Sequence, residues 1–396
     1  MSEQANPYAA FDHHAPNHRK NAEALWAELR ALPALAHSER HGGFYVVTRH
    51  SDLRAAAAQH AIYSSAFGVA LPSEDRTPHI PEEVDPPLQR EYRKILDPFL
   101  ARGVVDQFEP IVARHALALL DSFADEREVD FVARFSRPFP VLASIESFGF
   151  PPGDGEQLLG LVTGLIANRG NEAGKRASQD LTAYILNLLA AKAARPDADI
   201  VTAIAQGSVA GRALTQAEQV SMTRLLLFGG FTTVDLALSC AAYLFAKQPA
   251  LLRRLHEAPD LMATAVEEIV RIASPATYLA RTVTCPAQLG GAALQQGDRI
   301  LLCFAAANRD PEMFEHPLDV QLDRNPNPHV AFGFGTHRCV GSMFAKLEMR
   351  VALAELARRY ERFELVDEDT LAWGQGETQG FAQLPLKLHP RRTATR

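Results

Sequence analysis

Apolar positions recur at helical spacing along most of the chain, so helices are expected to dominate the structure. The longest pattern, Thr215–Ala246, is apolar around most of its circumference, which is typical of a helix buried inside a large protein. A second helix is expected over Leu261–Ile272, before Pro275, and a last one over Val340–Tyr360. Further helices are expected at Asn21–Leu29, after Pro86–Pro87, and over residues 105–125, 155–167 and 177–193.

Strands are expected to be short and peripheral. The segment Gly43–Thr48 has the β-branched and aromatic content of a strand, and residues 280–304 indicate short strands joined by glycine turns. Residues 195–214 are expected to form a loop, and residues 308–335, rich in Pro, Asn, Asp and Gly, a long irregular stretch. The patterns predict a mainly α fold, one domain over residues 1–396 with a large helical part and a small β-rich part.

Composition is ordinary for a soluble globular protein, with 47% hydrophobic and 22% charged residues. A formal net charge of -7 gives no overall basic field, so nucleic acid is not an expected partner. A chain of 396 residues is long enough to bury a large core and still enclose a ligand.

The segment Leu225–Ala246 is a membrane-span candidate by hydropathy, because its 22 residues carry one charge, Asp235. A charge near the middle of such a helix is costly in lipid. Two glycines and two threonines also crowd its first half. These features favour a buried core helix, and no membrane association is expected.

The four cysteines, which include Cys339, form no C-x-x-C pair, and Met1–Asn21 lacks the apolar run of a signal peptide. Disulfides are therefore not expected, and a reducing, cytoplasmic location fits best.

A glycine-rich loop, Phe332–Gly341, precedes the last predicted helix and contains Cys339. Amide groups at a helix start stabilise an anion, and Arg338 and His337 add positive potential, so the loop favours a thiolate. Such a thiolate could serve as a nucleophile, a zinc ligand or a haem ligand. Zinc is poorly supported because no second cysteine or histidine pair stands at ligand spacing. A cysteine nucleophile would need an activating histidine that the sequence does not place.

The loop resembles the pattern F-x-x-G-x-[HR]-x-C-x-G of the cytochrome P-450 superfamily. The five matching positions are Phe332, Gly335, His337, Cys339 and Gly341. The resemblance implies that the cofactor is haem b (iron protoporphyrin IX) and that these five positions bind it. It also implies that Cys339 is the axial ligand of the iron. The resemblance covers the chain from about Pro7 to Leu388. Within the family, the sequence resembles the soluble bacterial class.

A second motif, Glu268-Ile269-Val270-Arg271, resembles the family's E-x-x-R helix, with Arg271 placed 68 residues before Cys339. Alone it is weak, since Glu and Arg three apart form ordinary surface pairs. The resemblance implies that Glu268, Arg271 and Arg324 form a buried charge network that fixes the cysteine loop and does no chemistry.

Haem propionates require cationic partners and hydrogen-bond donors. The segment Asp85–Arg93 resembles the family's D-P-P-x-H-x-x-x-R helix start, with Gln89 in place of the usual histidine. By resemblance, Gln89, Arg93, Arg281 and His337 bind the haem. For each arginine taken alone, a solvated surface position is the simpler interpretation.

The segment Phe228–Thr233 on the long helix resembles the family's [AG]-G-x-[DE]-T motif over the distal haem face. The resemblance gives Thr233 a part in activating dioxygen. The usual acid that relays protons is replaced by Thr232, which is a departure from the family. The alternative for both threonines is that each hydroxyl bonds back into its own helix.

The remaining predictions concern substrate and partners. The long-helix motif is closest to the camphor-hydroxylating branch, but Thr77–Ile80 lacks that branch's tyrosine, so a small hydrophobic, terpenoid-like substrate is expected instead. The predicted pocket residues are Thr77, Phe228, Gly229 and Thr277. Because flavin and cluster-binding segments are missing, electrons are expected from a separate ferredoxin with a reductase and NAD(P)H.

The expected reaction is insertion of one oxygen atom from O2 into a C–H bond by a monomeric enzyme. A ferredoxin-docking patch is expected at Arg90, Lys94, Arg102, Arg338 and Lys346, and scattered solvated charges are the alternative. Other functions left open are a peroxide-driven peroxygenase, a haem sensor or carrier, and a helical protein without haem.

Overall fold

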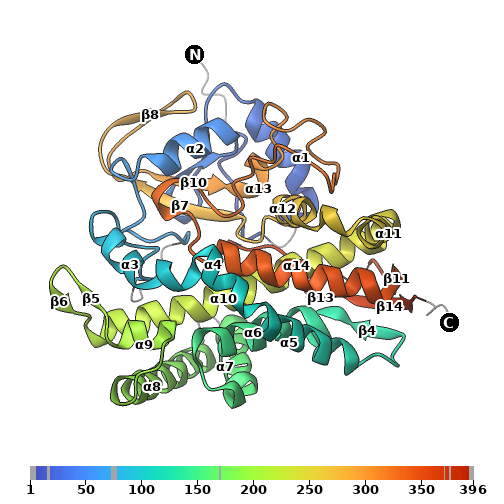
Figure 1. Cartoon of the computed structure of the whole chain (residues 1–396). Coiled ribbons are helices and arrows are strands. Elements are labelled where there is room, and N and C mark those ends of the chain that lie inside the picture. Colours follow the sequence, from blue (N-terminus) through green and yellow to red (C-terminus); the bar gives the residue numbers. More distant parts are fainter. Residues whose placement is uncertain are drawn as a thin grey trace.

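A large helical region and a smaller β-rich region lie against each other (Figure 1). The computed structural model describes residues 6–15, 18–72, 78–168, 171–369, 371–373 and 376–391. The α-helices are α1 (His18–Ala31), α2 (His50–Ala58), α3 (Leu88–Leu100), α4 (Arg102–Val105), α5 (Glu109–Asp121), α6 (Pro138–Phe148), α7 (Gly155–Ala167), α8 (Glu172–Ala194), α9 (Ile200–Ala205), α10 (Gln216–Lys247), α11 (Pro249–Glu257), α12 (Met262–Ala273), α13 (Phe304–Ala307) and α14 (Ser342–Arg359). The strands are β1 (Ala36–Ser38), β2 (Phe44–Val47), β3 (Tyr63–Ser64), β4 (Glu128–Asp130), β5 (Ser208–Val209), β6 (Arg212–Ala213), β7 (Tyr278–Val283), β8 (Ala287–Leu289), β9 (Ala292–Leu294), β10 (Arg299–Cys303), β11 (Tyr360–Leu365), β12 (Ala372–Trp373), β13 (Phe381–Gln383) and β14 (Pro385–Pro390).

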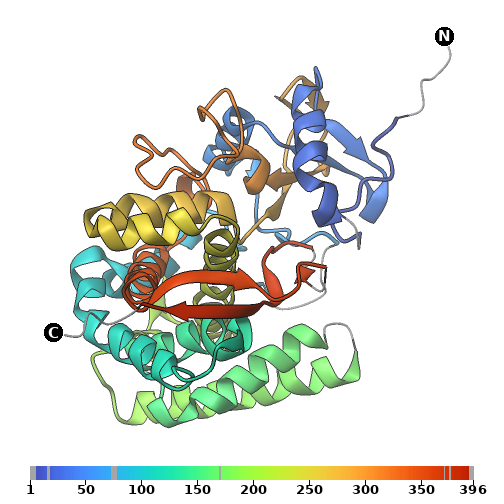
Figure 2. The ribbon, with the colours of Figure 1, turned by 90° about the vertical axis from the view of Figure 1, so that its right-hand side faces the viewer.

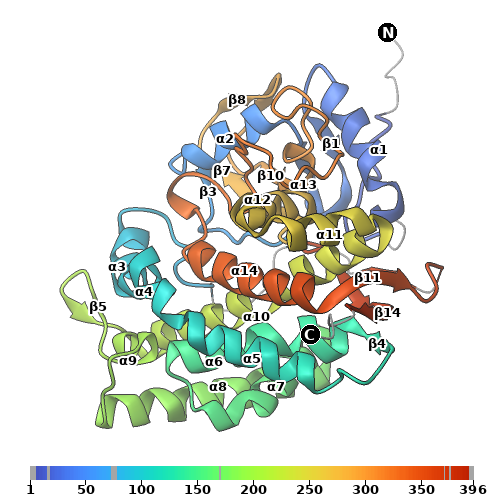
Figure 3. The same cartoon turned by 45° about the vertical axis from the view of Figure 1, so that its right-hand side comes forward.

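The helical region is built around α10, which α14 crosses in Figure 3, while α7 and α8 form the green outer pair of Figure 2. A capping box begins α10: the Thr215 hydroxyl accepts from the Glu218 N–H, and the Glu218 carboxylate accepts from the Thr215 N–H at 2.7 Å. By length and composition α10 could span a membrane, but 61% of its most apolar stretch is buried inside the fold. Its apolar residues therefore serve the core.

The β-rich region contains a five-stranded sheet in the order β1-β2-β10-β7-β3. Strands β2 and β10 pair in parallel and the other neighbours are antiparallel, with Ile300 opposite Arg281 between β10 and β7. Helix α1 is tied to this sheet by the Trp26 indole, which donates to the Tyr278 hydroxyl at 2.7 Å inside the core. This packing fixes the strand that carries Arg281.

The predicted fold class is confirmed: a mainly helical single domain with a smaller β part. The long helix, the two that end near residues 272 and 359, and the 155–167 helix match their predicted positions. The prediction of a loop over 195–214 was wrong, because this stretch contains α9 and the β5–β6 hairpin. Asp199 caps α9 by accepting from the Thr202 N–H at 2.7 Å, a local signal hidden among polar neighbours.

Candidate functional site

The cysteine loop is held by its own backbone and by α2. The Cys339 N–H donates to the Phe332 carbonyl at 2.8 Å, which closes the loop just before α14 begins. Gly335 has φ +70°, and a Cβ there would lie 2.5 Å from the Ala57 carbonyl oxygen. Only glycine fits at this close approach, so the loop packs directly onto α2.

Helix α3 holds the same loop from another side. The Gln89 amide, buried, donates to the Thr336 carbonyl at 2.9 Å, and Arg93 Nη1 donates to the Arg338 carbonyl at 2.7 Å. Arg93 also pairs with Asp97 at 3.0 Å. Thus the two α3 residues predicted to bind haem lie beside the cysteine loop and are bonded to its backbone.

Cys339 is an exposed residue, yet its thiol is closely surrounded by protein atoms. A thiol that lines an internal space has both properties, whereas a thiol on the outer surface has only the first. Burial raises its pKa in the protein alone, while the Gly341 N–H and the charges of Arg93 and Arg338 act in the opposite direction.

A buried cation lies near this loop on β7. Arg281 is 5% exposed, and its guanidinium donates to the Ala280 carbonyl at 2.8 Å; no carboxylate of the described residues forms an ion pair with it. Its nearest acids act only at longer range, and burial lowers its pKa. A buried guanidinium without an anionic partner is costly, so this position suits a bound anion.

His337 lies close to the same cation. Burial and then the charge of Arg281 lower its pKa to about 4, so the imidazole is neutral at pH 7. Its Nε2 lies 3.2 Å from the Ser65 hydroxyl and 3.7 Å from Asp85 Oδ1. Arg281 and His337 therefore bring a charge and a polar ring to one place.

One face of α10 is open although the helix is central. Gly229 is exposed, and a Cβ added there would meet no neighbouring atom within 4 Å, while Phe228 is half-buried beside the His79 ring, at 6.2 Å between centroids. Gly230 instead packs against α6, where an added Cβ would lie 3.0 Å from the Ser144 hydroxyl. Open space thus lies along Gly229.

The two threonines of this segment bond to their own helix. Thr232 Oγ1 donates to the Phe228 carbonyl at 2.9 Å, and Thr233 Oγ1 donates to the Gly229 carbonyl at 3.0 Å. Each hydroxyl oxygen keeps its lone pairs to accept from water or a ligand. Both threonine hydroxyls therefore bond back into their own helix, which is the alternative that the sequence left open.

The other predicted pocket residues contribute less. Thr277 is 2% exposed, and its hydroxyl donates to the Ser274 carbonyl at 3.2 Å, so it presents almost no surface to a ligand. Thr77 lies outside the described residues.

The one charge in the apolar part of α10, Asp235, is bonded to residues that directly precede α6. Asp235 accepts from the Ser136 hydroxyl at 2.6 Å and from Arg137 Nε at 3.3 Å. Burial raises its pKa to about 6, against the opposing effects of Ser136 and Arg137. These two partners were not foreseen from the sequence, because nearly a hundred residues separate them from Asp235.

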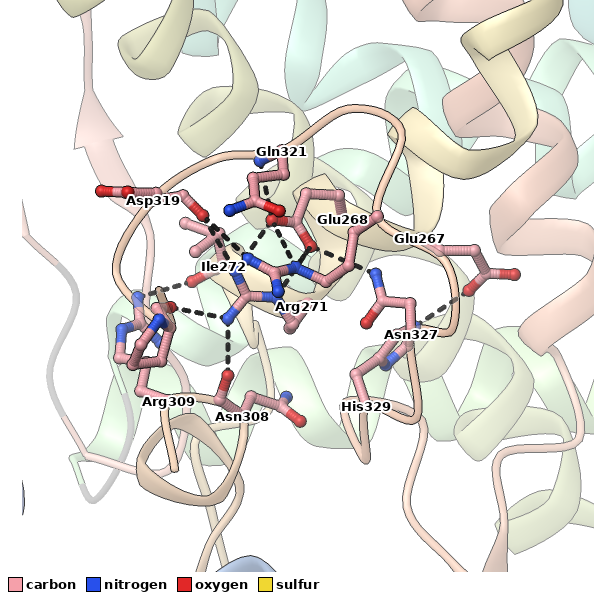
Figure 4. A network of polar contacts seen from close by, with 12 residues as sticks. Glu267, Glu268, Arg271, Ile272, Asn308, Arg309, Asp319, Gln321, Asn327 and His329 are labelled. Atoms are coloured by element: carbon pink, nitrogen blue, oxygen red, sulfur yellow. Dashed lines mark hydrogen bonds and ion pairs between the residues drawn. The ribbon is translucent and has the colours of Figure 1, made fainter. Parts of the chain in front are cut away.

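Glu268, Arg271 and Arg324 form a buried network on α12 and the segment that follows α13. Figure 4 shows Glu268 and Arg271 of this network with the chain around them. Arg271 donates twice to Glu268, both times at 2.8 Å, and Arg324 Nε donates to it at 3.0 Å. Arg271 Nη1 also donates to the carbonyls of Asn308 and Pro317, each at 2.7 Å. The structure thus brings the three predicted residues together and ties them to the irregular stretch before the cysteine loop.

Two further ionisable groups, one on α12 and one on α14, were missed. Glu267 bonds to His329 and Lys346, beside Phe332, and its pKa is lowered to about 2, where those partners outweigh burial. Glu348 on α14 is fully buried, neither carboxylate oxygen has a partner among the described residues, and burial raises its pKa strongly. The sequence pattern gives no sign that a single glutamate on a helix will be buried and neutral, so Glu348 could not be identified in advance.

The family model for cytochrome P450 matches residues 162–388, which is more than half of the chain. The chain belongs to the cytochrome P450 family. It is 29% identical over 364 residues to linalool 8-monooxygenase of Pseudomonas putida, covering 86% of this chain and 89% of the relative. It is 30% identical over 368 residues to beta-dihydromenaquinone-9 omega-hydroxylase of Mycobacterium tuberculosis, covering 88% and 72%.

Among solved structures, that of cytochrome P450 CYP101C1 superposes with a TM-score of 0.89 at 28% identity, covering 97% of this chain and 98% of the other. The protein is therefore an oxidoreductase of the monooxygenase type whose cofactor is haem b, held by a thiolate.

The described residues fit that cofactor. The accessible thiol in its fixed loop fits the iron, and the open glycine face of α10 fits the distal side of the haem. The buried guanidinium of Arg281, which has no ion-pair partner among the described residues, fits a propionate.

Proposed function

We propose that Cys339 ligates the haem iron, and that the protein uses this centre to insert oxygen from O2 into a C–H bond of a small hydrophobic molecule. The observation that carries the proposal is the accessible Cys339 thiol at the end of a loop anchored by α2, α3 and its own backbone. Bound haem supplies dioxygen activation and O–O cleavage, which an electron-donating thiolate assists.

Arg281 and His337 are the proposed propionate partners, the first by charge and the second as a neutral hydrogen-bonding ring. Gln89 and Arg93 have a different proposed role, because their donors already bond to the loop on either side of His337. They position the loop, and through it Cys339. The remaining loop positions, Phe332, Gly335 and Gly341, shape the backbone beneath the cofactor.

Thr233 is the proposed proton-positioning residue on α10. Its hydroxyl hydrogen is used by the Gly229 carbonyl, so the oxygen is fixed and can accept a hydrogen bond from water in the open space beside Gly229. Thr232 is not ionisable and bonds to its own helix, so it cannot relay protons as a carboxylate would. Water is therefore the proposed source of protons at this site.

A terpenoid-like substrate is the favoured class. Phe228 and Gly229 offer an apolar, open face, and the relative that acts on linalool has a terpenoid in its name. The likeness to the camphor-hydroxylating branch stays a prediction, as does the part of Thr77 and Thr277 in the pocket.

A ferredoxin, served by a reductase and NAD(P)H, is the proposed electron donor. Arg338 lines two surface pockets of about 290 and 390 Å³ beside the cysteine loop, and Arg90 lines the first of them. Lys94 and Lys346 are paired with Glu91 and Glu267, so Arg90, Arg102 and Arg338 are the main proposed docking cations. The monomeric state and cytoplasmic location stay predictions.

Turnover tests both the donor and the substrate class. A bacterial ferredoxin and its reductase with NADH are expected to support hydroxylation of a monoterpene alcohol, with product formed in proportion to O2 consumed. A peroxide-driven reaction is the second candidate, because Thr232 stands where the family has an acid. Product formed only with added hydrogen peroxide would favour that candidate; no product by either route would contradict both.

A further inference from the structure

A second group of chemically active side chains lies in the β-rich region, outside the haem site. Ligand atoms of Asp12, His13 and His41 lie within 4.8 Å of one another, and so do those of His13, His14 and Glu377. His13 belongs to both groups. The five residues come from the N-terminal segment, the turn before β2 and the segment before β13, so the fold alone brings them together.

His13 is the unusual member of this cluster. It is 1% exposed, and neither of its ring nitrogens has a hydrogen-bond partner among the described residues. Aromatic rings surround it, with the centroids of His14 at 4.2 Å and of Tyr278 at 5.1 Å. A buried imidazole ordinarily finds a partner for both nitrogens, so a ring without one among the described residues is a candidate for binding a ligand.

Histidine is a common ligand of metal ions, and it binds them through a ring nitrogen whose lone pair is free. The two His13 nitrogens have no hydrogen-bond partner among the described residues, so both are open to such a bond.

The remaining members are held in place by other contacts. His41 Nε2 lies 2.9 Å from Asp12 Oδ1, while His14 Nε2 lies 3.6 Å from Glu377 Oε1 and 2.7 Å from the Leu71 carbonyl. Asp12 is also bonded by the His14 N–H at 2.9 Å. Two carboxylates thus flank three imidazoles, and their two negative charges match one divalent cation.

We propose that this cluster is a binding site for a divalent transition-metal ion of the zinc class, with His13 as the central ligand. Imidazole nitrogen with carboxylate oxygen is a ligand set that Zn²⁺ accepts, whereas Mg²⁺ and Ca²⁺ prefer oxygen alone. His41 and Asp12 group with His13 in one set of candidate ligands, and His14 and Glu377 group with it in the other.

The expected role of the ion is structural. The Glu377 carbonyl accepts from the N–H groups of Thr277 and Tyr278 at 2.8 and 3.1 Å, so the segment of Glu377 is already fastened to the start of β7. An ion on His13 would fasten the N-terminal segment to the same place. Metal binding would therefore stabilise the region around β7 without taking part in oxygen chemistry.

Zinc titration of the haem-loaded protein, prepared without a polyhistidine tag, tests the proposal. Calorimetry is expected to give one tightly bound Zn²⁺ per chain, and added zinc is expected to raise the melting temperature. X-ray absorption at the zinc edge is expected to show nitrogen and oxygen ligands with imidazole scattering at about 2.0–2.1 Å and no sulfur.

Two variants locate the site. His13→Phe keeps an aromatic ring but removes both nitrogens, and His41→Gln alters a ligand nearer the surface; each is expected to weaken zinc binding at least about 100-fold. Cys285→Ser and His316→Ala, which remove an exposed thiol and an exposed imidazole elsewhere, are the controls and are expected to bind zinc normally. Absence of stoichiometric binding, a sulfur ligand shell, or unchanged binding in both His13→Phe and His41→Gln would overturn the proposal.

Discussion

Arg93 donates to the carbonyl of Arg338 at 2.7 Å, so α3 holds the backbone one residue before Cys339. Arg93→Ala removes this bond and is expected to loosen the loop, lowering haem content and speeding haem release to apomyoglobin. Arg93→Lys keeps the charge but loses the planar fork, so an intermediate rate is expected. Asp97→Asn alters the other partner of Arg93 and serves as the control. Equal haem release from all four proteins would mean that α3 does not position the loop.

Gly335→Ala is expected to destabilise the haem-loaded protein for two reasons. The added Cβ would lie 2.5 Å from the Ala57 carbonyl oxygen, and the backbone at this position has a positive φ. Gly211→Ala has a similar φ, +78°, but no atom within 4 Å, so it separates backbone strain from collision. Strain alone costs about 1–2 kcal/mol. Thermal unfolding followed at the Soret band is expected to show a clearly larger loss for Gly335→Ala, and equal losses would argue against the close packing of the loop on α2.

Glu268→Gln tests the buried network. The change leaves Arg271 and Arg324 without their buried anion, and loss of one partner from such a pair costs about 3–5 kcal/mol. Urea unfolding measures the loss. Glu172→Gln breaks an exposed pair with Lys175 at the same spacing along a helix and is expected to change little. A Glu268→Gln protein as stable as Glu172→Gln would show that the network contributes nothing.

Asp235 predicts a pH dependence. Its folded pKa of about 6 lies above the ordinary value of 3.8, so the folded state binds the proton more tightly than the unfolded state. The associated stability is present at low pH and is lost as pH rises from about 4 to about 6, by about 3 kcal/mol. Asp235→Asn cannot titrate. When the free energy of unfolding of both proteins is measured across this window, the variant is expected to lack the decline that the wild type shows. Parallel curves for the two proteins would contradict a raised pKa.

Motifs in which several residue types stand at fixed spacing were informative in the sequence. The cysteine loop, Glu268 with Arg271, and the long helix all lie where their patterns predicted, because each depends on local backbone geometry or on helical periodicity. The interaction of Asp235 with Ser136 and the His13 cluster were not predictable, because each joins segments that only the tertiary fold brings together. Helix α9 was missed since its six residues are too few to establish a period.

Ligation of the iron by Cys339 is the central claim, and the visible spectrum of the reduced protein with carbon monoxide tests it most directly. The wild type is expected to show a strongly red-shifted Soret band, and Cys339→Ser, which retains a smaller oxygen ligand, is expected to lose it while keeping the fold. Cys285→Ser is the matched control and should keep the band. A haem-loaded wild type without the red-shifted band, or a Cys339→Ser variant that retains it, would contradict thiolate ligation by Cys339.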